Sequence, residues 1–158
     1  METCCCCCFP IKFIKKDGTA EKFEGVTEAD IKANIRMVEI HRSFVYALGK
    51  TLYPEYDFIS HDLTKFSSAE LIPYTKKFIC KVDDSVNTDW KAAVQHHYDN
   101  NPHHPEYWGD QDMPEEYLKE SLVDMIAAKY QHREGRTSLP THIEPYIFEM
   151  KAMFLTRD

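Results

Sequence analysis

The spacing of apolar residues changes once along the chain. Residues 9–26 alternate weakly between apolar and polar positions, and the pair Asp17-Gly18 favours a tight turn between two strands. From Thr27 onward, apolar residues recur at every third or fourth position, as they do on one face of an α-helix. The pattern therefore predicts a short N-terminal β-hairpin followed by helices.

The first predicted helix spans residues 27–52. Thr27 and Asp30 approximate a capping box, in which each side chain bonds to the backbone of the other residue. Pro54 is expected to end the helix. One stripe along it is apolar except for a single histidine, and comprises Val38, His41, Val45, Leu48 and Leu52. We therefore expect His41 to lie on the apolar side of this helix.

The same spacing predicts four further helices, over residues 68–82, from about 88 as far as 102, from 114 to about 130, and from 141 to about 154. Ser67 or Ser68 is expected to cap the first of these, and Pro114 to begin the third. Inward positions on the first two are Leu71, Tyr74, Phe78, Trp90, Val94 and His97. The predicted fold class is an all-α bundle with a short β-hairpin at its N-terminus.

Length and composition favour one soluble globular domain, because 158 residues suit a single core and hydrophobic residues make up 43% of the chain. We divide the chain into residues 1–26, a cysteine-rich tail with a short β-ribbon, and residues 27–158, a single helical domain. The net charge of -7 argues against a nucleic-acid partner. An anionic substrate remains compatible, since a bound cation can invert the local field. Neither a membrane-spanning run nor a secretory signal is visible.

Cysteine usage predicts a reduced, cytoplasmic protein, because neighbouring cysteines rarely meet disulfide geometry and Cys80 is alone. The N-terminal run has three interpretations: a disordered tail, a soft-metal site, or an S-acylated cluster that anchors the protein to a membrane. Glu2 stands where myristoylation requires glycine. Acylation is therefore the only membrane link we expect, at Cys4, Cys5, Cys6, Cys7 and Cys8.

Histidine is the unusual feature of the composition, with eight in the chain and four of them between residues 96 and 104. Histidines and aspartates fall on or near inward faces of several predicted helices, namely His41, His61, Asp62, His96, His97, His103, His104 and Asp124. Each alone has an ordinary explanation, such as a hydrogen-bonded core histidine, a helix-end pair or a solvated side chain. Together they indicate a metal site, because buried imidazole and carboxylate groups need a partner, and these ligands suit Mn, Fe, Zn, Co or Ni.

Four motifs follow one another along the chain: HDLTKFS at residues 61–67, HHYDNNPHH at 96–104, MP at 113–114 and SLVDMIAA at 121–128. Their order resembles that of the HD-domain metal-dependent phosphohydrolases. The likeness is closer to an uncharacterised HD-like family of phages, bacteria and some eukaryotes, and covers about residues 35–130. It implies an HD-domain-like helical bundle whose metal ligands are His41, His61, Asp62 and Asp124. The chain departs from the pattern at Met37, where no acidic residue precedes His41, and in lacking a glycine-tyrosine-proline signature.

We expect the protein to be a metal-dependent hydrolase that acts on a small anionic substrate, such as a phosphate ester or nucleotide. No nucleic-acid partner is expected. One or two ions would activate water. Asp62 and Lys65 are the expected catalytic residues, and Lys65 and Asn101 the expected substrate contacts. His97 and His104 lie seven residues apart, as on one helix face, and join the predicted ligands; because Pro102 interrupts the helix, His96 and His103 are their alternates.

Two rival interpretations remain open at this point. In one, the ion only ties helices together in a non-catalytic structural or interaction protein. In the other, acylated cysteines recruit an interaction module to a membrane. Three aromatic residues could form a wall for a substrate or simply belong to the core: Tyr74, Tyr107 and Trp108.

Overall fold

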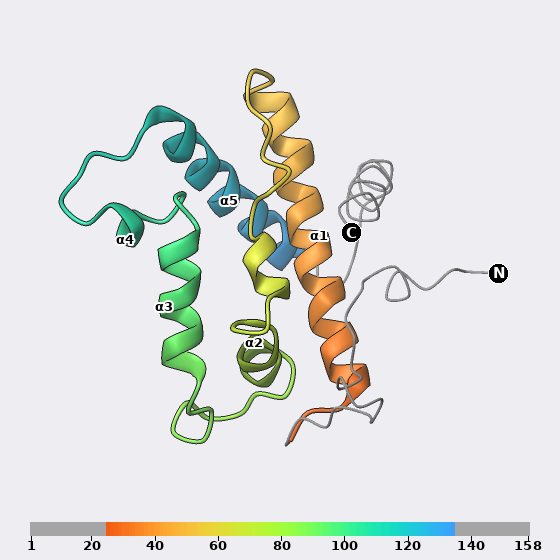
Figure 1. The fold of residues 1–158 in the computed structure, drawn as a ribbon. Coiled ribbons are helices and arrows are strands. Elements are labelled where there is room, and N and C mark those ends of the chain that lie inside the picture. Colours follow the sequence, from red (N-terminus) through yellow and green to blue (C-terminus); the bar gives the residue numbers. More distant parts are fainter. Residues whose placement is uncertain (1–24, 135–158) are drawn as a thin grey trace, which may run out of the picture.

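The computed structural model describes residues 25–134, and every regular element within that range is helical (Figure 1). The elements are α1 (Glu28–Leu52), the 3-10 helix η2 (Leu63–Phe66), α2 (Leu71–Phe78), α3 (Trp90–Asn100), α4 (Pro105–Trp108) and α5 (Glu115–Glu134). The predicted all-α class is confirmed for this range. The cysteine run and the last predicted helix lie outside the described residues, as does almost all of the predicted hairpin, so these and the domain division stay predictions.

Helix α1 begins as its sequence predicts. The Thr27 hydroxyl accepts a hydrogen bond from the Asp30 amide at 3.1 Å, and the Asp30 carboxylate accepts one from the Thr27 amide at 2.8 Å. The helix ends at Leu52, where the Tyr53 amide bonds back to the Gly49 carbonyl. Leu52 itself is 46% exposed, so the predicted apolar stripe is wrong at its last position.

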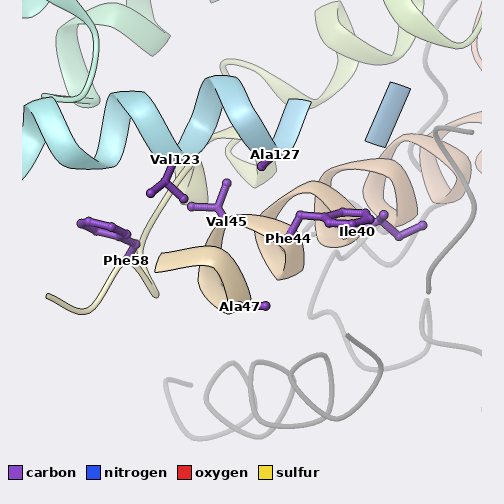
Figure 2. Close-up of a cluster of buried hydrophobic side chains, with 7 residues drawn as sticks. All are labelled: Ile40, Phe44, Val45, Ala47, Phe58, Val123 and Ala127. Atoms are coloured by element: carbon purple, nitrogen blue, oxygen red, sulfur yellow. The ribbon is translucent and has the colours of Figure 1, made fainter. Parts of the chain in front are cut away.

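The core forms where α1 packs against α5, as Figure 2 shows. It is made of buried side chains from both helices and one from the loop after α1: Ile40, Phe44, Val45, Ala47, Phe58, Val123 and Ala127. A smaller cluster joins the start of α1 to α2 through Ile31, Ile35 and Leu71. None of the described helices is long and apolar enough to cross a membrane.

Helix α2 is shorter than residues 68–82 and is not capped by Ser67 or Ser68. The Ser67 carbonyl instead accepts hydrogen bonds from the Glu70 and Leu71 amides, so residues 67–70 form a turn before the helix. At the other end the Val82 amide bonds to the Lys76 carbonyl, and Lys81 adopts a left-handed conformation with φ 56°. Local turn geometry therefore overrides the longer apolar pattern.

The remaining helices follow the prediction within a few residues. α3 runs from Trp90 to Asn100, and α5 begins directly after Pro114 and continues to Glu134. Two short elements, η2 and α4, were not predicted. α2 packs against both α1 and α3, and in Figure 1 it lies between these two helices. The residues just before η2, His61 and Asp62, lie among α1, α3 and α5.

Candidate metal centre

Four predicted ligands converge from three separate segments. Nε2 of His41, on α1, lies 2.8 Å from Oδ1 of Asp124, on α5. Nε2 of His61, in the turn before η2, lies 3.3 Å from Nε2 of His41 and 3.4 Å from the same Asp124 oxygen. Asp62 completes the group, with Oδ2 at 3.8 Å from Nε2 of His41. His41 and Asp124 meet because each lies one turn before a core residue, Val45 and Ala127 respectively, on the helix faces that pack together.

A second group surrounds the other oxygen of Asp62. Nε2 of His97 and Nε2 of His103 approach Asp62 Oδ1 at 3.3 and 3.4 Å, and Nε2 of His104 lies 3.0 Å from Nε2 of His97. The ligand atoms of Asp62, His97, His103 and His104 all lie within 4.8 Å of one another. The same holds for His41, His61 and Asp62. Asp62 therefore belongs to both groups.

The structure brings three of the four clustered histidines into the site. His97 and His104 are those we predicted, and His103, an alternate, joins them. His96 points elsewhere, since its Nδ1 bonds to Glu70 at 2.7 Å and its side chain is 36% exposed. The reason is that α3 ends at Asn100 and a turn follows, so residues 103 and 104 do not continue the helical phase of residues 96 and 97.

Asn101 stabilises this turn. Its Nδ2 donates to the His97 carbonyl at 2.7 Å and lies 2.8 Å from Oγ1 of Thr64, which ties the end of α3 to η2. The side chain is buried and does not line the cavity described below. A direct contact with substrate, as the sequence suggested, therefore stays a prediction.

Two carboxylates that were not predicted from the sequence contact Nδ1 of three site histidines, the ring nitrogen that faces away from the centre of the site. Glu120 Oε1 lies 2.8 Å from Nδ1 of His61 and 3.3 Å from Nδ1 of His103. Glu70 Oε2 lies 2.9 Å from Nδ1 of His97. Such bonds fix the tautomer and direct Nε2 inward, as they do around protein-bound metals. The spacing of Glu120 four residues before Asp124 on one helix face was the signal available in the sequence.

Two atoms at the centre of the site are buried without a hydrogen-bond partner, namely Asp62 Oδ1 and His103 Nε2. They face each other at 3.4 Å, but without hydrogen-bond geometry. Buried polar atoms are almost always paired, so an acceptor oxygen and an imidazole nitrogen left together require an explanation. A cation between them would satisfy both. The residues present thus fit a metal ion.

The backbone before η2 is also specialised. Arg42 is buried, and its Nε donates to the His61 carbonyl at 2.7 Å while its Nη2 donates to the Ile59 carbonyl. Asp62 follows in the left-handed region, with φ 55°. Most residues other than glycine avoid this conformation, although aspartate and asparagine tolerate it. The turn aims the side chains of two successive residues into the same site.

The electrostatics favour positive charge in the centre. Burial alone would raise the pKa of Glu120 and Asp124, but hydrogen bonds to His103, His61 and His41 lower both, to about 2 for Glu120. Burial would lower the pKa of His61, but Asp62, Asp124 and Glu120 outweigh it and raise that pKa to about 10. Without an ion, protons on histidines therefore balance the carboxylates.

His104 behaves in the opposite way. Burial and the neighbouring His103 and His97 lower its pKa to about 4, so its imidazole is neutral at physiological pH. Burial and His61 likewise lower the pKa of His41, against the hydrogen bond to Asp124. Neutral imidazole is the form that binds metals or accepts a proton.

A cavity of about 390 Å³ adjoins these groups. Its polar end is formed by His41, Asp62, Lys65, His97, His104 and Asp124. Lys65 Nζ lies 2.9 Å from Asp62 Oδ2, as expected for a side chain one turn away. Tyr74 lines the cavity as predicted, whereas Tyr107 and Trp108 do not. Tyr107 is 44% exposed, and the Trp108 indole donates to the Pro102 carbonyl.

The model of DUF5662, a family of unknown function, matches residues 30–153. The chain belongs to the DUF5662 family. No curated protein and no solved structure matches it. The match includes every residue of the candidate site, so the histidines and carboxylates lie within the part of the chain that defines its DUF5662 membership. It does not connect DUF5662 with the HD-domain phosphohydrolases, and that resemblance stays a prediction.

Proposed function

We propose that this DUF5662 protein is a metal-dependent hydrolase that acts on a phosphate ester or nucleotide by activating water. The observation that supports the proposal is a pair of buried atoms without a hydrogen bond, Asp62 Oδ1 and His103 Nε2, at the junction of two ligand groups. Carboxylates hold Nδ1 of His61, His97 and His103, which leaves Nε2 of each directed toward an ion. The adjoining cavity gives a substrate access to the same groups.

The ligands suit a divalent transition metal. They are imidazoles and carboxylates without cysteine, which favours Mn, Fe, Zn, Co or Ni over a thiolate zinc site. One ion would be held by His41, His61, Asp62 and Asp124. A second would be held by His97, His103 and His104, with Asp62 between the two. The arrangement thus accommodates one or two ions.

Each residue has a defined part in the proposed reaction. A bound divalent ion lowers the pKa of water and polarises a phosphoryl oxygen. Lys65 points toward Asp62 and lines the cavity, where it would attract a phosphoryl group to the polar end. Asp62 holds the ligand groups in register and orients the attacking water. When a single ion is held by His41, His61, Asp62 and Asp124, the neutral imidazole of His104 would be available to accept a proton.

The first test is metal analysis of the purified protein, followed by a panel of phosphate esters and nucleotides. Asp62→Asn keeps the shape and tolerates the left-handed backbone, but removes the charge. We expect it to lose bound metal and at least about a hundredfold in activity. Lys65→Ala should keep its metal but bind the substrate less tightly, seen as a higher KM. Metal-loaded wild type that hydrolyses nothing in the panel would refute the proposal.

The structural alternative has its own support. The ligands come from α1, the turn before η2, the end of α3 and α5, so an ion would join segments that share only small apolar clusters. In that case Asp62→Asn would lower the melting temperature, since metal binding would be coupled to folding, and no hydrolysis would be found. Thermal unfolding with and without a chelator separates the two functions when measured beside the activity panel.

A further inference from the structure

The cavity beyond the metal ligands has an aromatic wall. α2 and α3 contribute Tyr74, Phe78, Trp90, Val94 and Tyr98 to its lining. The Trp90 ring meets Tyr74 edge-on with centroids 4.9 Å apart, and Phe78 with centroids 5.8 Å apart. Rings that brace one another in this way form a rigid surface. The wall reaches the metal ligands, since the rings of Tyr98 and His104 are 5.1 Å apart.

The part of the lining that comes from α1 and α5 mixes apolar with polar side chains. Met37 and Val38 line the cavity from α1, and Ala128 from α5. Met37 lies one turn before His41, so the apolar surface begins directly beside a metal ligand. Besides the metal ligands, the polar residues in this part are Asn34, Gln131 and His132.

Charged groups in the cavity are confined to its polar end. Among the residues that line it, Lys65 is the one lysine or arginine, and its ammonium is paired with Asp62. A chain of phosphates would have to place its outer charges against Phe78, Trp90 and Val94. Lys77 lies over the Trp90 ring, with Nζ 5.4 Å from the ring centroid, but it does not line the cavity and is paired with Asp84, so it offsets little of the desolvation of those charges. The hydroxyls of a sugar placed against these three apolar side chains would also lose water and gain few partners.

We infer that the substrate carries a single phosphoryl group attached to an apolar, ring-sized group, and that this group occupies the space between Met37 and Trp90. The inference rests on the proposed function, because it places the phosphoryl group at the ligands. It narrows the substrate class from phosphate esters and nucleotides in general to monoesters of aromatic or similarly apolar alcohols. The volume, about 390 Å³, is in the range of small-molecule sites.

Binding of non-hydrolysable probes to the metal-loaded full chain tests this inference separately from catalysis. The probes are phenylphosphonate, methylphosphonate and uncharged benzyl alcohol, measured by titration calorimetry. Burial of the phenyl ring should make phenylphosphonate bind at least about tenfold more tightly than methylphosphonate. Equal affinities for the two phosphonates would overturn the inference and leave the proposed function standing.

A matched pair of variants locates the effect. Val94→Trp places a ring in the cavity from α3, whereas Gln95→Trp adds the same ring at the next, exposed position. Val94→Trp should bind the two phosphonates about equally tightly, with its methylphosphonate affinity and metal content unchanged. Gln95→Trp should still prefer phenylphosphonate. A preference that survives in Val94→Trp would overturn the inference. If Val94→Trp does not fold, Trp90→Ala should lose the preference by removing the wall.

The third probe, benzyl alcohol, distinguishes failure of the apolar subsite from failure of the proposed phosphoryl function. If neither phosphonate binds but benzyl alcohol does, and Val94→Trp abolishes that binding, the apolar subsite stands and the phosphoryl function falls. If none of the three probes binds, the subsite is refuted as well.

Discussion

Helices α1 and α5 meet in two neighbouring contacts of opposite character. In the first, Ile40, Phe44 and Val45 pack against Val123 and Ala127, and all five are almost completely buried. In the second, one residue further along each helix, His41 meets Asp124. The apolar contact is complete, because each side chain has neighbours on every side. The polar contact belongs to a group that still contains buried atoms without partners.

The difference separates a contact that stabilises the helix pair from one that costs free energy. Apolar burial stabilises the fold without any further component. A cluster of buried histidines and carboxylates costs free energy until its charges are balanced, and proteins keep such clusters where function requires them. The apolar contact thus acts as the support that holds an otherwise unfavourable cluster together. The predictions below separate the two contacts.

The largest expected effect is on the apolar contact. Phe44→Ala removes a fully buried ring and should lower the free energy of unfolding by about 3–5 kcal/mol, measured by urea denaturation of the metal-free protein. Leu122→Ala is the control, since Leu122 lies on α5 but is 42% exposed, and it should change stability by less than about 0.5 kcal/mol. Equal losses in the two variants would show that α1 and α5 do not form the core.

The next effect concerns protons in the polar contact. The carboxylates overcome burial and raise the pKa of His61 to about 10, so His61 is protonated in the metal-free protein between pH 6 and 8. A metal must displace that proton, and its affinity should fall about tenfold for each unit by which the pH is lowered. For the metal-free protein the sign is reversed: this imidazolium stabilises the fold fully below about pH 6.5, and its contribution is lost as the pH rises toward 10.

Calorimetric titration with metal in buffers of different ionisation enthalpy measures the released protons directly. Release of about one proton or more is expected between pH 6 and 8. Heats that do not depend on the buffer would mean that His61 is already neutral, and that the surrounding carboxylates do not keep a proton on its imidazole.

The smallest expected effect is on metal affinity, and it compares two glutamates of α5. Glu120→Gln keeps the size of the side chain but weakens the hold on Nδ1 of His61 and of His103, and should reduce metal affinity about 10–100-fold. Glu116→Gln, one turn earlier and exposed, is the matched control and should bind metal as wild type does. If both variants bind metal equally well, Glu120 has no positioning role.

The sequence predicted those parts of the molecule that local patterns specify. The capping box of Thr27 and Asp30 set the start of α1, and the helical spacing set the face that carries His41. The motifs brought His41, His61, Asp62 and Asp124 into one candidate site, and the structure brings these four side chains together. Whether they bind an ion is what the experiments on Asp62 decide.

The parts that were missed depend on contacts between distant segments. Glu70 directly precedes α2, but nothing near it in sequence shows that its carboxylate contacts His96 and His97 on α3. His103 enters the site because the chain turns after Asn100, which a helical phase cannot predict. The end of α2 was also predicted wrongly. The helix closes at Phe78, before the left-handed Lys81, although the apolar pattern continues.

The left-handed backbone at Asp62 restricts how this site can change in other members of the family. With φ 55°, the position accepts aspartate, asparagine or glycine far more readily than any longer or branched side chain. Glutamate would keep the charge but strain the turn that Arg42 holds. If other DUF5662 proteins share the proposed metal site, a member that has lost it should carry asparagine or glycine at the position of Asp62, so this position would mark the loss in an alignment.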